Sequence, residues 1–152
     1  MKLYLVQHGE ARPESEDPQR SLTQRGMEAV RNVAKIAKKL NLHPTVIHHS
    51  GKLRAEQTAR ILADSLGKPA AAAGGLNPND DVRKWVDRIS REKGDVMIVG
   101  HLPFLEKVAS LLLAGDENTR PVLFRYGAVV CLEKKETGGW AVRWVLTPEM
   151  AA

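Results

Sequence analysis

The chain has 152 residues, 43% of them hydrophobic, and 23 Lys and Arg against 18 Asp and Glu give it a formal net charge of +5. This length suits one domain with a buried core, so residues 1–152 are expected to form a single domain. No apolar run approaches the ~20 residues that a membrane-spanning helix needs, and the first residues do not resemble a signal peptide. We therefore expect a cytoplasmic protein without a membrane partner.

Composition also limits the partners. The excess of basic residues favours anionic partners in general. However, Lys and Arg are interleaved with acidic residues along the chain, and aromatic residues make up only 5% of it. We therefore expect no nucleic-acid partner. The single cysteine, Cys131, lies in the apolar run 128–132 and is predicted to be a buried strand residue in a reducing compartment.

Strands and helices alternate in the first three quarters of the chain. Apolar runs predict strands over residues 2–7, 45–49 and 95–100. Helical spacing and end signals predict helices over residues 24–40, 52–66, 79–91 and 103–114. Thr23 is the expected N-cap of the first helix, and Gly67 the expected end of the second. Residues 10–20 are expected to form an irregular loop, and residues 69–75 a connector.

The last part of the chain is rich in β-forming residues. Residues 128–133 and 140–146 are expected to pair across the polar turn 134–139, which contains Gly138 and Gly139. The alternation that precedes this hairpin favours parallel strands covered by helices. The sequence therefore predicts an α/β sheet with an antiparallel hairpin added at its end.

Two histidines follow strand-like runs, His8 after residues 2–7 and His101 after residues 95–100, and Arg54 follows a third such run. The carboxyl ends of parallel strands meet at one edge of the sheet, where ligands bind in open α/β folds. Two imidazoles and a guanidinium there suit phosphoryl transfer. His8 is the candidate nucleophile, and His101 would stabilise the transition state. Gly9 would let the substrate approach the backbone, whose amides would serve phosphate oxygens.

The histidines have two other interpretations. A single histidine at a strand end is more often a structural, hydrogen-bonded residue than a catalytic one. The presence of Arg54 together with both histidines favours a phosphoryl-transfer site. A metal centre is the other interpretation, because the adjacent pair His48-His49 adds two imidazoles. Neighbouring strand residues point to opposite faces, so at most one of that pair can join His8 and His101. No ligand spacing typical of zinc is present, and no metal is expected.

Several further segments resemble the histidine phosphatase superfamily, and in particular its small SixA-type phosphohistidine phosphatases. The matching residues are His8-Gly9, Leu22-Thr23 with Gly26, Ser50 with Arg54-Ala55 and Gln57-Thr58, Leu76-Asn77-Pro78, and Gly100-His101 with Pro103 and Leu105. The resemblance extends over nearly the whole chain and lacks the large insertions of mutase-type members.

The resemblance implies a three-layer α/β/α fold with a mostly parallel central sheet. It further implies a phosphatase that removes the phosphoryl group from a histidine-phosphorylated protein through a phospho-His8 intermediate. Arg54 would grip the phosphoryl group, and His101 would stabilise the transition state. No metal or organic cofactor is implied.

One departure from the family pattern concerns phosphate binding. Gln7 stands where the family carries an arginine, and a neutral donor contributes less than a charged one, about 1 against 2 kcal/mol. The Gln7 amide still offers a donor, so slow turnover is expected. Arg12 or Arg20, from the loop over residues 10–20, is a candidate to restore the missing charge. Gly51, which replaces a family proline, is expected to matter little.

The general acid has three candidates. Asp80 and Asp81 follow the second helix in sequence, where other family members place a carboxylate, and Glu10 lies beside His8-Gly9. An imidazole leaving group, with its pKa near 6.5, needs little help from an acid. Two alternatives therefore stay open beside the phosphohistidine phosphatase. One is a phosphomonoesterase that acts on a small phosphorylated substrate, and the other is a weakly catalytic or non-catalytic module that binds phosphate or phosphoproteins.

Overall fold

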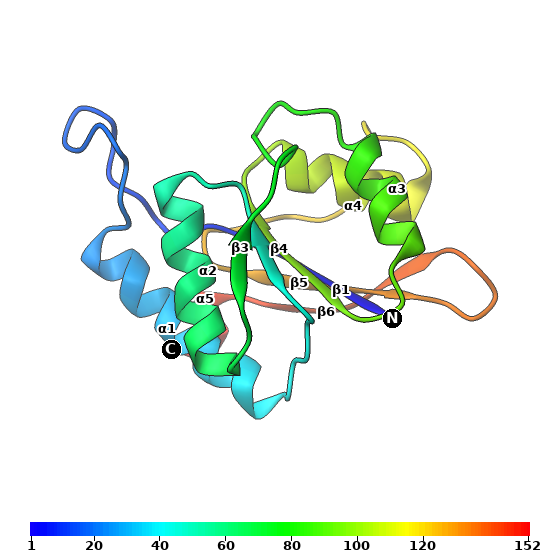
Figure 1. The fold of residues 1–152 in the computed structure, drawn as a ribbon, viewed down its shortest axis with the longest axis horizontal. Coiled ribbons are helices and arrows are strands. Elements are labelled where there is room, and N and C mark those ends of the chain that lie inside the picture. The colour runs from blue at the N-terminus through cyan, green and yellow to red at the C-terminus, as the bar shows by residue number, and fades with distance from the viewer.

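The computed structural model describes all 152 residues, which form a single six-stranded sheet with helices on both faces (Figure 1). The strands are β1 (Lys2–Gln7), β2 (Ile47–His49), β3 (Ala70–Ala72), β4 (Val96–Gly100), β5 (Val129–Lys134) and β6 (Trp140–Leu146). The helices are α1 (Gln24–Lys39), α2 (Leu53–Leu66), α3 (Arg83–Arg91), α4 (Phe104–Ala114) and α5 (Pro148–Ala151).

The strand order is β3-β2-β4-β1-β5-β6. The first four strands of this order are parallel, whereas β5 runs antiparallel to both β1 and β6. This confirms the predicted α/β/α fold, including the C-terminal hairpin. Its turn uses Gly138 and Gly139, both with positive φ angles.

Alternating side chains of the central strand β1 separate two apolar cores. Leu3 and Leu5 join the core that includes residues of α3 and α4, and Tyr4 and Val6 join the one beneath α1 and α2. Cys131 belongs to the second core, where burial raises the pKa of its thiol to about 11. It is thus the buried strand residue that the sequence predicts.

Three elements differ from the predictions. The segment expected to be a connector contains β3, because its backbone pairs with β2 although alanine is a poor strand former. The helix predicted from residue 79 begins at Arg83, because the backbone amides of Asn77 and Arg83 donate to the carboxylates of Asp80 and Asp81 in the preceding turns. The short helix α5, which Thr147 caps, was not predicted.

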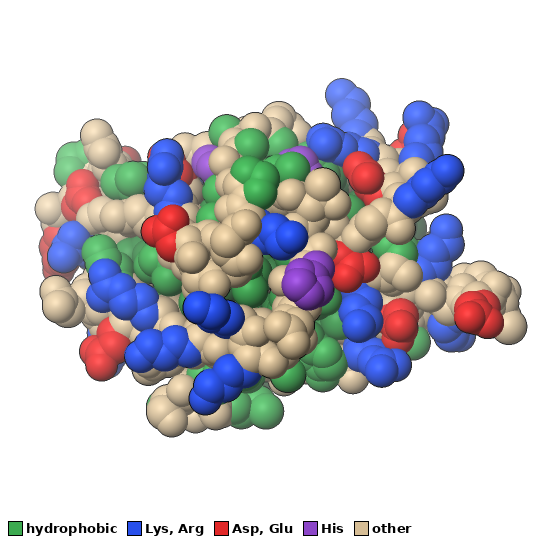
Figure 2. All heavy atoms as spheres, turned by 60° about the horizontal axis from the view of Figure 1, so that its bottom comes forward, with side chains coloured by type: hydrophobic (Ala, Val, Ile, Leu, Met, Phe, Trp, Pro, Cys, Tyr) green, Lys and Arg blue, Asp and Glu red, His purple; other side chains and the backbone are tan.

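The surface offers few distinguishing features on its own. None of the helices is both long and apolar enough to cross a membrane. On the face drawn in Figure 2, basic side chains are interspersed with acidic ones. The carboxyl ends of β1 and β4 meet at one edge of the sheet, where open α/β folds bind ligands.

Candidate active site

His8 and His101 lie side by side because the strands that precede them are neighbours. β1 and β4 pair in parallel with Gln7 opposite Gly100, and the backbone amide of His8 donates to the carbonyl of Gly100 at 3.0 Å. The two imidazole ring centroids are 5.1 Å apart, and the exposed fractions of the residues are only 6% and 2%. The structure thus brings the two predicted histidines together at the edge of the sheet.

His8 is held as a neutral imidazole with a defined tautomer. Its Nδ1 lies 2.7 Å from the carbonyl oxygen of Gly9, which only accepts, so we assign the ring proton to Nδ1. Burial lowers the pKa of His8 to about 4, and Arg54 and Arg20 add to this effect. At neutral pH, Nε2 therefore carries a free electron pair, which is what a nucleophile requires.

Ser50 orients the second histidine. Its hydroxyl lies 2.6 Å from His101 Nε2 and accepts from the backbone amide of Lys52 at 3.3 Å, which leaves its own proton for the imidazole. Burial, followed by the charge of Arg54, lowers the pKa of His101 to about 3. A neutral ring that accepts at Nε2 carries its proton on Nδ1, and that buried nitrogen has no partner within the protein. His101 Nδ1 is thus a free donor.

Arg54 enters the site from the first turn of α2. Thr58, one turn later, donates its hydroxyl to the Arg54 carbonyl at 2.8 Å and accepts from the backbone amide of Gly9 at 3.0 Å. Thr58 therefore fixes α2 against the segment that follows β1. The guanidinium Nε of Arg54 is buried without a partner in the protein, which makes it a second free donor.

The structure gives Gly9 two contacts that the sequence did not indicate. Its amide donates to the Thr58 hydroxyl oxygen at 3.0 Å. A Cβ at this position would lie 2.8 Å from Cγ2 of Val30 in α1, so the missing side chain makes room for the helix. Gly26 of α1 is needed for the same reason, because a side chain there would strike the backbone of Glu10.

Gln7 presents an amide next to the nucleophile. The residue is 7% exposed, and its Oε1 is buried without a partner in the protein. Rotating the amide by 180° exchanges this acceptor for an NH₂ donor at little steric cost. Gln7, Arg54 and His101 thus each leave one buried polar atom unsatisfied, and such atoms are costly unless a ligand binds them.

A second cation reaches the site from the loop before α1. Arg20 adopts a left-handed conformation with a φ of 53°, and its Nε donates to the carbonyl of Arg12 at 3.2 Å. Its charge contributes to the lowered pKa values of His8, His101 and Arg54. Arg12 itself donates to Ser21 on the surface. Arg12 and Arg20 were the two candidates to replace the charge that Gln7 lacks, and the structure places Arg20 near the site.

The basic side of the site forms a cavity of about 620 Å³. Arg20, Lys52 and Arg54 line it together with Glu14 and Glu56. The charge of Lys52 also contributes to the lowered pKa of His101. Basic side chains outnumber acidic ones here, so this side favours an anion.

The carboxylates expected as general acids are engaged elsewhere. Glu10 accepts from Arg25 and Thr23 at 2.8 and 2.9 Å, and these bonds hold the pKa of its carboxyl below the ordinary value. Asp80 and Asp81 accept from the backbone amides of Asn77 and Arg83 in the turns before α3. Glu10 is therefore an anion at neutral pH, and the other two carboxylates are bound by their own turns.

His48 and His49 also take other partners. The His48 ring packs edge-on against Trp85 at 5.3 Å. His49 lies on the opposite face, where its Nδ1 accepts from the backbone amide of Gly51 at 3.1 Å. Neither ring makes a contact with His8 or His101, so the pair adds nothing to the site.

Three functional features had not been assigned from the sequence. Ser50 and Thr58 belong to the matched motif, but only their hydrogen bonds show what they do. Tyr126 comes from the loop before β5, and its ring centroid lies 5.5 Å from that of His8. No spacing in the sequence connects residue 126 to residue 8, so this contact follows only from the fold.

Comparisons with known proteins agree with this geometry. Phosphohistidine phosphatase SixA of Escherichia coli (strain K12) is 26% identical over 155 residues, which cover 97% of this chain and 94% of SixA. A solved structure of the protein histidine phosphatase SixA with tungstate has a TM-score of 0.84 at 26% identity and 97% coverage of both chains. An α-ribazole phosphatase from Shigella flexneri shares the fold, with a TM-score of 0.80 at 15% identity and 97% coverage of both chains.

The family assignment rests on a family model that matches the half of the chain holding most of the site residues. The model of the histidine phosphatase superfamily (branch 1) matches residues 3–78, which hold His8, Ser50 and Arg54. An uncharacterised protein of Picosynechococcus is 34% identical over 137 residues, which cover 85% of this chain and 83% of that protein. The chain belongs to the histidine phosphatase superfamily, whose members are phosphatases.

Proposed function

We propose that the protein is a phosphohistidine phosphatase that acts on a histidine-phosphorylated partner protein through a phospho-His8 intermediate. The observation that carries this proposal is the buried, neutral His8, whose Nδ1 proton is held by Gly9 so that Nε2 is free to attack. The similarity to SixA over 97% of the chain supports the substrate class.

The first chemical step transfers the phosphoryl group to His8. Nε2 of His8 forms a bond to phosphorus while the P–N bond of the substrate breaks, and its electron pair stays on the leaving imidazole. Arg54 Nε and His101 Nδ1 donate to the phosphoryl oxygens. The Gln7 amide, rotated to present its NH₂, is the third donor.

Hydrolysis of the intermediate completes the cycle. A water molecule attacks phosphorus, the P–Nε2 bond breaks, and His8 leaves as the neutral imidazole that Gly9 already holds. The proton that water loses passes to the phosphate product. The burial that lowers the pKa of His8 makes this imidazole a good leaving group.

The state of the carboxylates favours a P–N bond over an ordinary phosphate ester. An alkoxide needs a proton from a general acid, whereas a phosphohistidine protonated on its second ring nitrogen leaves as neutral imidazole. Glu10 is paired with Arg25, and the carboxylates of Asp80 and Asp81 accept from backbone amides in the turns before α3. A site without a protonated carboxyl therefore suits phosphohistidine.

We expect the reaction to proceed without a metal ion. Arg54, Arg20 and Lys52 supply positive charge where a phosphoryl group would bind. Phosphate release should accordingly be unchanged by EDTA, and stimulation by an added divalent cation would contradict this part of the proposal.

The experiment is to measure phosphate release from a protein phosphorylated on histidine, with His8→Ala as the control for contamination and chemical hydrolysis. Release above that control supports the proposal. Hydrolysis of ordinary phosphate esters that depends on Asp80 or Asp81 would instead indicate a phosphomonoesterase. Phosphate binding without turnover, abolished by Arg54→Ala, would indicate a binding module.

A further inference from the structure

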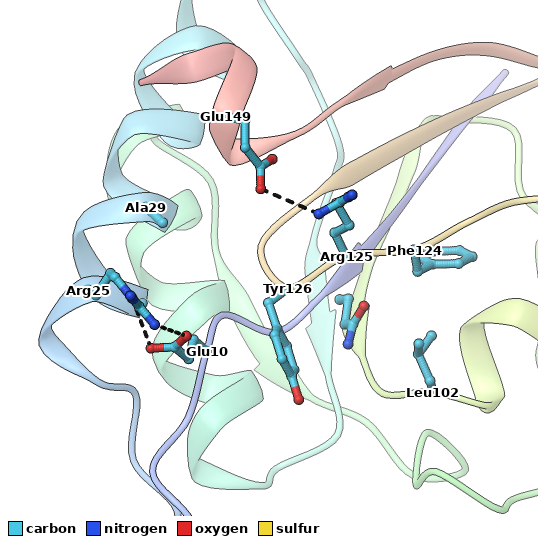
Figure 3. A pocket seen from close by; sticks show the side chains of 10 residues that line it. Glu10, Arg25, Ala29, Leu102, Phe124, Arg125, Tyr126 and Glu149 are labelled. Carbon is cyan, nitrogen blue, oxygen red and sulfur yellow. Dashed lines mark hydrogen bonds and ion pairs between the residues drawn. The ribbon is translucent and has the colours of Figure 1, made fainter.

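A cavity of about 540 Å³ lies beside Tyr126, whose ring contacts that of the candidate nucleophile His8. Gln7, Leu102, Phe124 and Tyr126 contribute to its wall, and Tyr126 also contacts the His8 ring. Figure 3 shows the Tyr126 ring projecting into this cavity, with Glu10 on one side and Leu102 on the other. Through Tyr126, the cavity thus adjoins the candidate nucleophile.

The backbone holds Tyr126 in place beside His8. Gly127 has a φ of 75°, and its amide donates to the carbonyls of Gln7 and His8 at 2.9 and 3.2 Å. The turn is closed by a bond from the amide of Ala128 to the carbonyl of Arg125 at 3.1 Å. Tyr126 is 50% exposed, so its ring is fixed at its base and still accessible to a ligand.

The cavity beside Tyr126 and the cavity around Arg54 differ in charge. In the cavity beside Tyr126, Glu10 pairs with Arg25 at 2.8 Å and Glu149 with Arg125 at 3.7 Å, so its charges balance (Figure 3). The cavity around Arg54 has an excess of positive charge. A phosphoryl group is therefore drawn to the Arg54 side, which leaves the balanced cavity for the group attached to it.

We propose that the cavity beside Tyr126 is the leaving-group subsite, and that Tyr126 selects a planar imidazole by stacking on it. This inference rests on the proposed function and adds a specificity-determining residue to it. A flat ring gains from an aromatic wall, and a protonated imidazole gains further from the electron-rich ring face. A flexible alkylamine presents no ring to stack.

The test compares two peptides of one sequence, phosphorylated on histidine or on lysine, since both carry a P–N bond and only one carries a ring. Tyr126→Ala should lower kcat/KM for the phosphohistidine peptide about five- to tenfold and for the phospholysine peptide less than about twofold. Tyr126→Phe should keep both values. Leu123→Ala, at an 80% exposed position of the same loop, is the matched control and should change neither. Equal losses on both peptides, or no loss, would overturn the inference.

A failure of the proposed function can be distinguished from a failure of the proposed subsite. If the wild-type protein hydrolyses neither peptide, it is not a phosphatase for these bonds. Binding of the two peptides to the wild-type protein and to the Tyr126→Ala variant then tests the subsite directly. A fivefold weaker binding of the phosphohistidine peptide by the Tyr126→Ala variant supports the subsite without catalysis. Equal binding by both proteins, or none, overturns it.

Discussion

Replacing Gln7 by arginine is expected to raise kcat/KM for phosphohistidine by about 5- to 30-fold. Gln7 is 7% exposed and lies beside the His8–His101 pair, and it offers a neutral amide where the family carries a guanidinium. The substitution adds a charged donor to the phosphoryl oxygens, whose negative charge it would stabilise in the transition state.

The magnitude follows from the difference between two hydrogen bonds. A neutral donor contributes about 1 kcal/mol and a charged one about 2 to 3 kcal/mol. The gain of about 1 to 2 kcal/mol corresponds to a factor of about 5 to 30 in rate. It stays below the ~10³-fold upper range for a single oxyanion donor, because Arg54 and Arg20 already supply positive charge.

The same substitution is expected to destabilise the free protein. A guanidinium at position 7 joins Arg54 and Arg20 in a site with little solvent, so the free energy of unfolding falls in buffer without phosphate. Tungstate should raise the melting temperature of the Gln7→Arg variant more than that of the wild type, because the anion binds the folded state.

The assay is phosphate release under kcat/KM conditions, with Gln7→Met as the control of similar length that lacks any donor. The methionine variant should be slower than the wild type. If Gln7→Arg binds tungstate more tightly but hydrolyses no substrate faster, residue 7 does not limit turnover, and the explanation of slow catalysis is wrong.

Three further predictions test the tautomers and the compensating charge. The NMR signals of the His8 and His101 rings should show no titration between pH 8 and 5. Histidines in the unfolded chain titrate near pH 6.5 and bind protons that the folded protein does not. The free energy of unfolding should therefore fall as the pH drops from about 6.5 towards 4. Ser50→Ala should lower kcat about tenfold with little change in KM, whereas Ser50→Thr should restore it; an equal effect of both would indicate a merely structural role. Arg20→Ala should reduce kcat/KM about tenfold in the wild type but only about twofold in the Gln7→Arg variant. An equal loss in both proteins would show that Arg20 does not compensate for Gln7.

Most of the fold could be predicted because its signals are local. The apolar runs of β1 and β4 and the Thr23 cap of α1 follow from neighbouring residues. The strand β3 was missed, because three alanines form a strand only through the partner strand β2. The start of α3 was misplaced, because the Asp80 and Asp81 carboxylates bind backbone amides in turns.

The site could be predicted in part for a similar reason. His8, Arg54 and His101 follow strands, and parallel strands bring their carboxyl ends to one edge. What the small residues do could not be predicted, because Gly9 is needed by a helix that starts fifteen residues later. Tyr126 was missed, since its position depends on where the turn before β5 meets β1.

The cations of the site have two opposed effects that explain how a glutamine is tolerated at position 7. In the free protein, Arg54 and Arg20 repel one another and help to keep His8 neutral. A bound phosphoryl group would cancel this repulsion and raise the basicity of His8 for the proposed attack. A further guanidinium would strengthen anion binding but increase the repulsion before the substrate arrives. With a neutral Gln7, the site depends more on Arg20 and on the intrinsic reactivity of the P–N bond, which is the class of bond that needs the least help from charged residues.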